Sequence, residues 1–210
     1  MKIYRIASSV WDAENGIGAT PNNMDVDYKG FVTMKIYRIA QEIFRGDSTP
    51  VNLEDYDVEY GIKELGKELG SSAAWGPGIY FTGQEDIAQM YGANITKKFI
   101  NNANILTKQS PLFSYNKMNK ILQGIDQETM ESAILNWDED YNIGKKMLLQ
   151  SIINGDNCLE QIMNIWAEIF YHQRANDFIE LMVRNGIDGI FIQKEDDETY
   201  YVIYNKAVLA

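Results

Sequence analysis

The chain is poor in the residues that cross-link small folds or hold metal ions. Its 210 residues include one cysteine, Cys158, and one histidine, His172. A single cysteine excludes an internal disulfide framework and is typical of a reducing compartment. No Cys and His residues stand at metal-ligand spacing, so we expect no metal site. With no serine or cysteine in a nucleophile setting, His172 is interpreted as a helix-end residue, which argues against a triad hydrolase.

Long apolar runs are also missing. No run approaches the ~20 residues that a membrane-spanning helix requires, and the start MKIYRIASS lacks the apolar stretch of a signal peptide. We therefore expect a cytoplasmic protein that makes no use of a membrane. Neither a P-loop nor a GxGxxG motif occurs, which leaves kinase, NTPase and Rossmann interpretations with little support.

Basic residues are outnumbered. The chain has 19 Lys and Arg against 30 Asp and Glu, a formal net charge of −11. Such a surface repels phosphate backbones and disfavours nonspecific nucleic-acid binding, whereas it favours basic protein partners. Apolar residues make up 45% and aromatic residues 12%, as in globular proteins. The length suits one large domain, or one domain with an appendage.

The segment MKIYRIA occurs twice, at 1–7 and at 34–40. Both copies alternate as strands do. A duplicated strand is one interpretation, and a second translation start at Met34 is the other. Residues 12–30 between the copies are rich in Gly, Asn, Asp and Pro, which predicts a loop. We predict an N-terminal strand and loop extension at 1–33, followed by a domain at 34–210.

Periodicity predicts an α+β fold for this domain, with strands at both ends and helices between them. The helical middle contains an apolar series after an Asp126 cap and the strongest apolar stripe of the chain, from Leu159 to Phe170. We interpret that stripe as core and not as a cofactor site. Other elements are expected at 62–69 (short helix), 97–107 (strand kinked at the asparagines), 177–184 (helix ending at Gly186) and 187–193 with 199–204 (hairpin).

The most informative run is GPGIYFT at Gly76–Thr82, followed by QEDIAQMYG. Its two glycines allow close backbone approach, its strand ends on a hydroxyl, and the next segment is expected to be a helix. Tyr80 and Tyr91 would then face one cleft suited to a planar ligand such as nicotinamide. The alternative is an edge strand turning into a packed helix, with both tyrosines half buried.

Two further motifs flank this run. Phe44-Arg45-Gly46 lies upstream, and Asn185–Ile192 with Thr199–Asn205 lies downstream. In this order the three motifs resemble the ADP-ribosyltransferase superfamily, especially the compact type carried in the polyvalent proteins of phages and other mobile elements. The resemblance implies an ADP-ribosyltransferase-like fold of two small, mainly antiparallel sheets around a cleft, with an inserted helical lobe. It also implies NAD as a substrate and a macromolecular acceptor, which we expect to be a protein, in a bacterial host if the chain is phage-encoded.

The resemblance assigns roles to individual residues. Arg45 would hold a ribose hydroxyl or a phosphate, and the backbones of Gly46 and Gly78 would approach the nicotinamide. Tyr80 and Tyr91 would stack on it. Thr82 would steady the catalytic acid or the ribose, or simply cap the following helix. For Arg45 the alternative is a surface ion pair with Asp47.

The catalytic acid departs from the pattern. The family has Glu directly before the last strand's YVV-like run, where this chain has Tyr200. Glu198, two residues earlier on the same strand face, is the candidate acid. The alternative places Glu198 in a solvated acidic turn. Three functions therefore stay open: a transferase, an NAD glycohydrolase in which water replaces the acceptor, and a noncatalytic interaction module.

Overall fold

The computed structural model describes residues 38–59, 75–194 and 197–210, with side chains from residue 41 onward. The chain divides into two compact units, Met1–Lys35 and Ile36–Ala210, and the second of these is described below. The predicted extension at 1–33, the first MKIYRIA copy and the short helix at 62–69 lie outside the described residues. The second copy ends within the first described strand.

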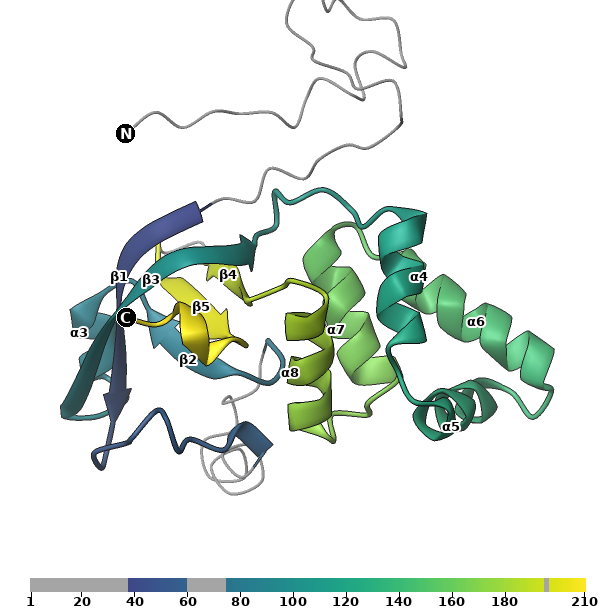
Figure 1. The fold of residues 1–210 in the computed structure, drawn as a ribbon, viewed down its shortest axis with the longest axis horizontal. Coiled ribbons are helices and arrows are strands. Elements are labelled where there is room, and N and C mark those ends of the chain that lie inside the picture. Colours follow the sequence, from purple (N-terminus) through teal and green to yellow (C-terminus); the bar gives the residue numbers. More distant parts are fainter. Residues whose placement is uncertain (1–37, 60–74, 195–196) are drawn as a thin grey trace, which may run out of the picture. The chain divides into compact units, whose positions relative to one another are not determined.

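The described strands form one closed ring in the order β1, β2, β5, β4, β3 (Figure 1). Only the β3–β4 pair is parallel among them. The expected α+β class and the mainly antiparallel pairing are confirmed, whereas the two separate sheets are found as a single ring. The strands are β1 (Arg38–Asp47), β2 (Ile79–Thr82), β3 (Asn94–Leu106), β4 (Gly189–Gln193) and β5 (Thr199–Ile203).

The ring consists of two well-paired groups joined by short contacts. β1 and β3 pair along their length, and β4, β5 and β2 form the second group. Phe44 opposite Thr82 joins the groups at one side, and the end of β3 pairs with the start of β4 at the other. The ring closes because the long β1 and β3 strands extend far enough to reach the second group at opposite ends.

A bulge bends the long β1–β3 pair. Between two neighbouring residue pairs of the β1–β3 ladder, one residue of β1 stands opposite two residues of β3, Asn101 and Asn102. Asn102 has a φ of 56°, in the left-handed region that asparagine tolerates better than most residues. The predicted kink at the asparagines is therefore confirmed. Such a bulge bends and twists the strand, which favours closure of the ring.

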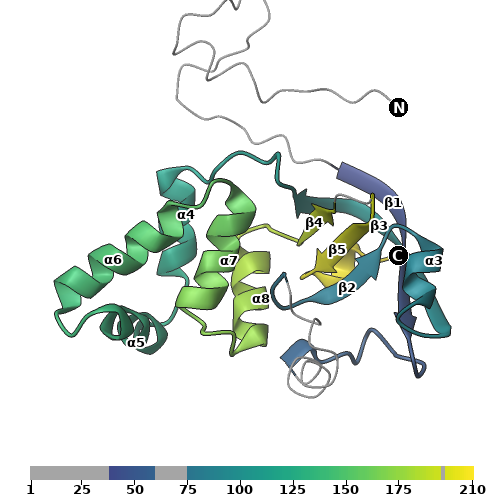
Figure 2. The ribbon, with the colours of Figure 1, turned by 180° about the vertical axis from the view of Figure 1, so that it is seen from behind.

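Helices α4 to α7 lie at the end of this unit opposite α3, and α8 lies between α7 and the sheet (Figures 1 and 2). The Asp126 side chain accepts a hydrogen bond from the Thr129 amide, so the predicted cap of α5 is confirmed. Helices α4 and α6 were not predicted from the sequence. The helices are α3 (Glu85–Gln89), α4 (Tyr115–Gln123), α5 (Gln127–Trp137), α6 (Tyr141–Ile153), α7 (Cys158–Glu168) and α8 (Ala175–Arg184), with a 3₁₀ turn at Lys206–Val208.

The predicted apolar stripe of α7 is core. Trp166 is only 1% exposed, and its ring lies 5.3 Å from that of Phe178 in α8. Phe178 in turn meets Tyr204, which directly follows β5, edge to face at 6.0 Å. These aromatic contacts join the helical end to the sheet. His172 follows the end of α7, is exposed and contacts the Trp166 ring edge to face, as expected of a helix-end residue.

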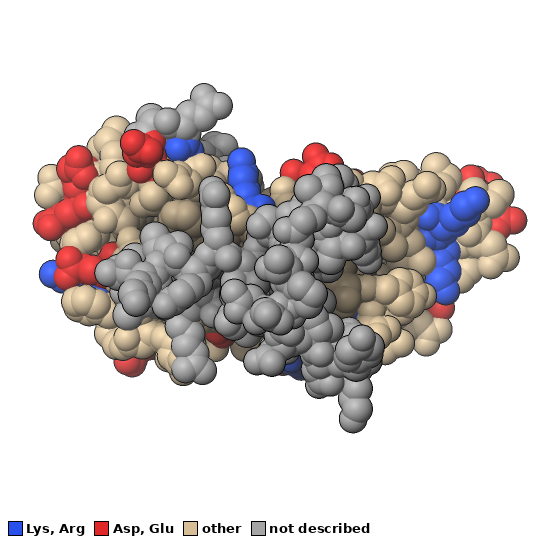
Figure 3. All heavy atoms as spheres, turned by 90° about the horizontal axis from the view of Figure 1, so that it is seen from above, with Lys and Arg blue, Asp and Glu red and all other residues tan. Residues whose placement is uncertain are grey.

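On the face seen in Figure 3, acidic side chains lie over the end of this unit that contains the strand ring. A group of basic side chains lies toward the end that contains helices α4 to α7. Within the described ranges, none of the helices combines the length and the apolar character needed to cross a membrane.

Candidate functional site

The three motif-bearing segments are neighbours in the ring. Phe44 in β1 lies opposite Thr82 in β2, and β2 pairs with β5 from Ile79 opposite Ile203 to Thr82 opposite Tyr200. Segments more than 100 residues apart in sequence, such as Thr82 and Tyr200, are thereby brought into register. The segments 43–46, 78–82 and 199–204 therefore contribute adjacent strands, as the resemblance implies, while their lining of one common cleft stays a prediction.

Arg45 projects from β1 and is mostly buried, with 11% of its side chain exposed. Its Nε and Nη2 atoms donate to the Asp47 carboxylate at 2.7 to 3.0 Å. Nη1 donates to the Tyr80 carbonyl at 3.4 Å, and the guanidinium carbon lies 4.8 Å from the centre of the Tyr56 ring. Burial lowers the pKa of Arg45, but the hydrogen bonds and charge interactions with Asp47 and Tyr56 together outweigh it and hold that pKa above its ordinary value.

The two glycines assigned to cofactor binding are required by packing. An added Cβ at Gly46 would lie 1.8 Å from the Ala88 carbonyl oxygen of α3. At Gly78, φ is 155°, and a Cβ would lie 2.4 Å from a methyl group of Val202. Glycine at these positions therefore lets α3 pack on β1 and β5 pack on the start of β2, which suffices to explain both residues.

Four side chains form what we call the aromatic cluster: Trp75, Tyr80, Tyr91 and Tyr200. Tyr80 donates to the Gly76 carbonyl at 2.6 Å and accepts from the Trp75 amide at 3.2 Å. The Trp75 ring stacks on Tyr80 at 6.3 Å and lies 5.0 Å from Tyr200. Tyr91, 55% exposed, reaches the Tyr200 hydroxyl at 3.3 Å. Tyr80 thus borders Trp75, Tyr91 borders Tyr200, and the contact between Trp75 and Tyr200 connects the two pairs.

Glu198 stands at the edge of this cluster, just before β5. Its Oε2 atom accepts from the Tyr200 hydroxyl at 2.7 Å and from Lys194 Nζ at 3.1 Å, and 22% of its side chain is exposed. The bond from Tyr200, followed by that from Lys194, holds the pKa of Glu198 below its ordinary value. Burial, with Tyr91 and Glu198 as neighbours, raises the pKa of Tyr200. Glu198 is therefore an ionised carboxylate bound by two donors.

Thr82 is buried and serves the local turn. Its Oγ1 atom accepts from the Gln84 amide at 3.2 Å, where α3 begins. Gln84 in turn binds the start of β5, with its Oε1 accepting from the Thr199 amide at 3.1 Å and its Nε2 donating to the Asp197 carbonyl at 3.0 Å. Thr82 and Gln84 thus fix the turn that carries Glu198 against the β2–α3 junction.

The structure brings Tyr80, Tyr91 and Glu198 together through Trp75 and Tyr200, and it joins Arg45 to Tyr80. Thr82 reaches Glu198 only through Gln84 and Thr199. Sequence reasoning did not assign Trp75, Gln84, Lys194 or Tyr200 to the site. Trp75 directly precedes the GPG turn and Tyr200 occupies the expected acid position, so the sequence held a signal for these two.

A separate cavity of about 640 Å³ lies between β4 and α7. It shares Trp75 and Lys194 with the neighbourhood of the cluster, but none of the residues predicted to bind NAD lines it. Within the described part of the chain, no group of three or more His, Cys, Asp or Glu side chains is arranged to hold a metal ion. Comparisons with protein-family models, curated proteins and solved structures gave no match.

Proposed function

We propose that the chain is an NAD-dependent ADP-ribosyltransferase that modifies a macromolecular acceptor. The observation that carries the proposal is the bonded series from Tyr91 through Tyr200 to Glu198, with hydroxyl and carboxylate separations of 3.3 and 2.7 Å. It supports Glu198 as the acid that the resemblance requires. The link from Arg45 to Tyr80 adds support, since it joins the first motif to the second.

The proposed reaction breaks the bond between nicotinamide and C1′ of the ribose. The bonding electron pair leaves with nicotinamide, C1′ gains a bond to the acceptor nucleophile, and the acceptor loses a proton. A negative charge near the oxocarbenium-like transition state stabilises it. Both bonds to Glu198 end on Oε2, so Oε1 is left to accept from a ribose hydroxyl.

A noncatalytic interaction module is the second candidate. The observation that favours it is the pair between Arg45 and Asp47, which occupies Nε and Nη2 of the guanidinium. A bidentate fork already bound to a carboxylate has fewer donors left for a ribose or a phosphate. An acidic chain that keeps such a fold would then act through its surface.

Incubation of the full chain with NAD labelled in the ADP-ribose part, together with a bacterial lysate, tests the proposal. Label on protein supports the transferase, label on nucleic acid changes the acceptor class, and free ADP-ribose indicates a glycohydrolase. Calorimetry with NAD is run in parallel. Absence of both turnover and NAD binding would leave the interaction module as the function.

A further inference from the structure

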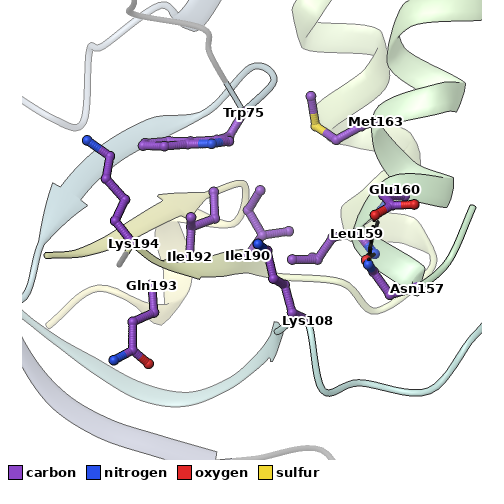
Figure 4. A pocket seen from close by; sticks show the side chains of 10 residues that line it. All are labelled: Trp75, Lys108, Asn157, Leu159, Glu160, Met163, Ile190, Ile192, Gln193 and Lys194. Atoms are coloured by element: carbon purple, nitrogen blue, oxygen red, sulfur yellow. Dashed lines mark hydrogen bonds between the residues drawn. The ribbon is translucent and has the colours of Figure 1, made fainter. Parts of the chain in front are cut away.

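The cavity between β4 and α7 has the walls of a ligand site. Its volume of about 640 Å³ falls within the ~300–1,000 Å³ of small-molecule pockets. Alternate residues of β4 share one face of the strand, and Figure 4 shows Ile190 and Ile192 pointing toward Trp75 while Gln193 points away. Leu159 of α7 adds a further apolar side chain.

Trp75 gives one wall a flat surface. The residue is half buried, and in Figure 4 its ring lies across the cavity from the isoleucine side chains of β4. Met163 of α7 borders the same opening. A flat apolar molecule between an indole and aliphatic side chains buries both of its faces, which is the arrangement that favours an aromatic ligand.

Two lysines border these apolar walls. Lys108 follows β3 and makes no hydrogen bond or ion pair with any described residue. Lys194 lies with Nζ 5.7 Å from the centre of the Trp75 ring and is paired with Glu198. A smaller adjoining cavity of about 220 Å³ is also lined by both lysines. In a chain with a net charge of −11, a cation such as Lys108 beside an apolar cavity points to an anionic group on the ligand.

The one acidic residue of the lining is already bonded. Glu160 accepts from the Asp156 amide at 2.7 Å through one oxygen and from Asn157 Nδ2 at 3.1 Å through the other. Its carboxylate therefore belongs to the start of α7, where a negative charge stabilises the helix. Lys194 is likewise paired, with Glu198 at 3.1 Å, so Lys108 is the charged group of the lining with capacity for a ligand.

We propose that this cavity binds a planar organic anion, an aromatic body carrying one carboxylate or phosphate, at a site distinct from the proposed NAD site. The aromatic body lies between Trp75 and the β4 isoleucines, and the anion lies at Lys108. The proposal does not depend on the proposed function. Binding to this cavity is measured without turnover. A failure of the cavity proposal and a failure of the proposed function can therefore be told apart.

Three probes of equal ring size test the site on the full chain: 2-naphthoate, the neutral 2-naphthamide and the cationic 2-naphthylmethylamine. Titration by calorimetry or ligand-observed NMR should show naphthoate binding tightest and the amine weakest. A gain of about fivefold for naphthoate over the amide is expected from one partly exposed ion pair. Equal affinity for all three, or no binding at millimolar concentration, overturns the proposal.

Lys108→Met keeps the length of the side chain and removes the charge. Naphthoate affinity should fall about fivefold and naphthamide affinity should stay unchanged. Lys146→Met, on the exposed side of α6, is the matched control and should change neither. If the two variants behave alike, the lysine has no role and the proposal fails. Because both side chains are exposed, neither variant is expected to unfold the chain.

Competition with NAD locates the probe. Naphthoate that remains bound at saturating NAD supports a distinct site, whereas stoichiometric displacement would make the cavity part of the dinucleotide site and overturn the proposal. Leu159→Trp, which fills the cavity, should remove binding of both naphthoate and naphthamide. Circular dichroism establishes that this variant is folded. If it is not, the Lys108→Met comparison decides.

Discussion

The Tyr200 hydroxyl donates a 2.7 Å hydrogen bond to Oε2 of Glu198, two residues earlier in the chain. Tyr200 stands at the position where the proposed resemblance implies a catalytic acid. The tyrosine itself supplies no carboxylate there but binds the carboxylate of Glu198, which comes from the preceding turn. Its hydroxyl also lies 3.3 Å from that of Tyr91, which connects the carboxylate to the segment just after α3.

Glu198→Gln should lower turnover of NAD by about 10²-fold or more, because it removes the charge that faces the transition state while keeping the shape of the side chain. NAD affinity should change little, since that charge matters most in the transition state. Single-turnover kinetics and calorimetry measure the two quantities. Asp197→Asn, one residue earlier, is the matched control and should retain the rate. Equal rates for the two variants would remove Glu198 from the mechanism.

Tyr200→Phe should raise the pKa of Glu198, because the hydrogen bond from Tyr200 is the largest cause of its lowering. The pKa should move up toward the ordinary range of a glutamate, while Lys194 still holds it somewhat lower. Carboxyl ¹³C NMR titration measures the pKa of Glu198 whether or not the protein turns over NAD. If it does, the acid limb of the kcat/KM profile should also shift to higher pH. Tyr201→Phe, whose hydroxyl binds Gln41, is the control. An unmoved titration would show that the bond is not formed in solution.

Tyr80→Ala should weaken NAD binding, whereas Tyr80→Phe should largely keep it, because the ring face does the stacking. The phenylalanine variant loses the hydroxyl that bonds Gly76 and Trp75. Its unfolding free energy should therefore fall by roughly 1 kcal/mol per lost bond. Calorimetry with NAD and urea unfolding separate the two effects. Equal loss of affinity in both variants would assign the role to the hydroxyl instead.

Gly46→Ala should destabilise the fold, because its Cβ would lie 1.8 Å from the backbone oxygen of Ala88. A clash with backbone is relieved only by moving α3 away from β1, and overpacking of this kind costs about 1–3 kcal/mol. Urea unfolding gives the change in stability. A fully stable variant with weakened NAD binding would instead favour the cofactor role that the resemblance implies for Gly46.

Trp166→Ala should cost roughly 3–5 kcal/mol of unfolding free energy, because the side chain is 1% exposed and joins α7 to α8. Thermal and chemical unfolding measure the loss. The control is Trp137→Ala at the end of α5, a partly exposed residue, which should cost less. Lost NAD binding with unchanged stability would place α7 in the site instead of the core.

The sequence by itself determined the local elements of this chain. The hairpin strand that follows Glu198, the Asp126 cap of α5 and the Leu159–Phe170 stripe are each decided by neighbours within a few residues, and the structure contains all three. Helices α4 and α6 were not predicted, and α4 buries only Met118 and Ile121.

Only the tertiary structure decided how these elements meet. The closure of two strand groups into one ring depends on how far β1 and β3 extend, which no periodicity reveals. The contacts of Trp75 with Tyr200 and of Tyr91 with Tyr200 depend in the same way on strand register across distant segments. A side chain's own propensity fixes its backbone, but its partner is set by the register and packing of the whole sheet.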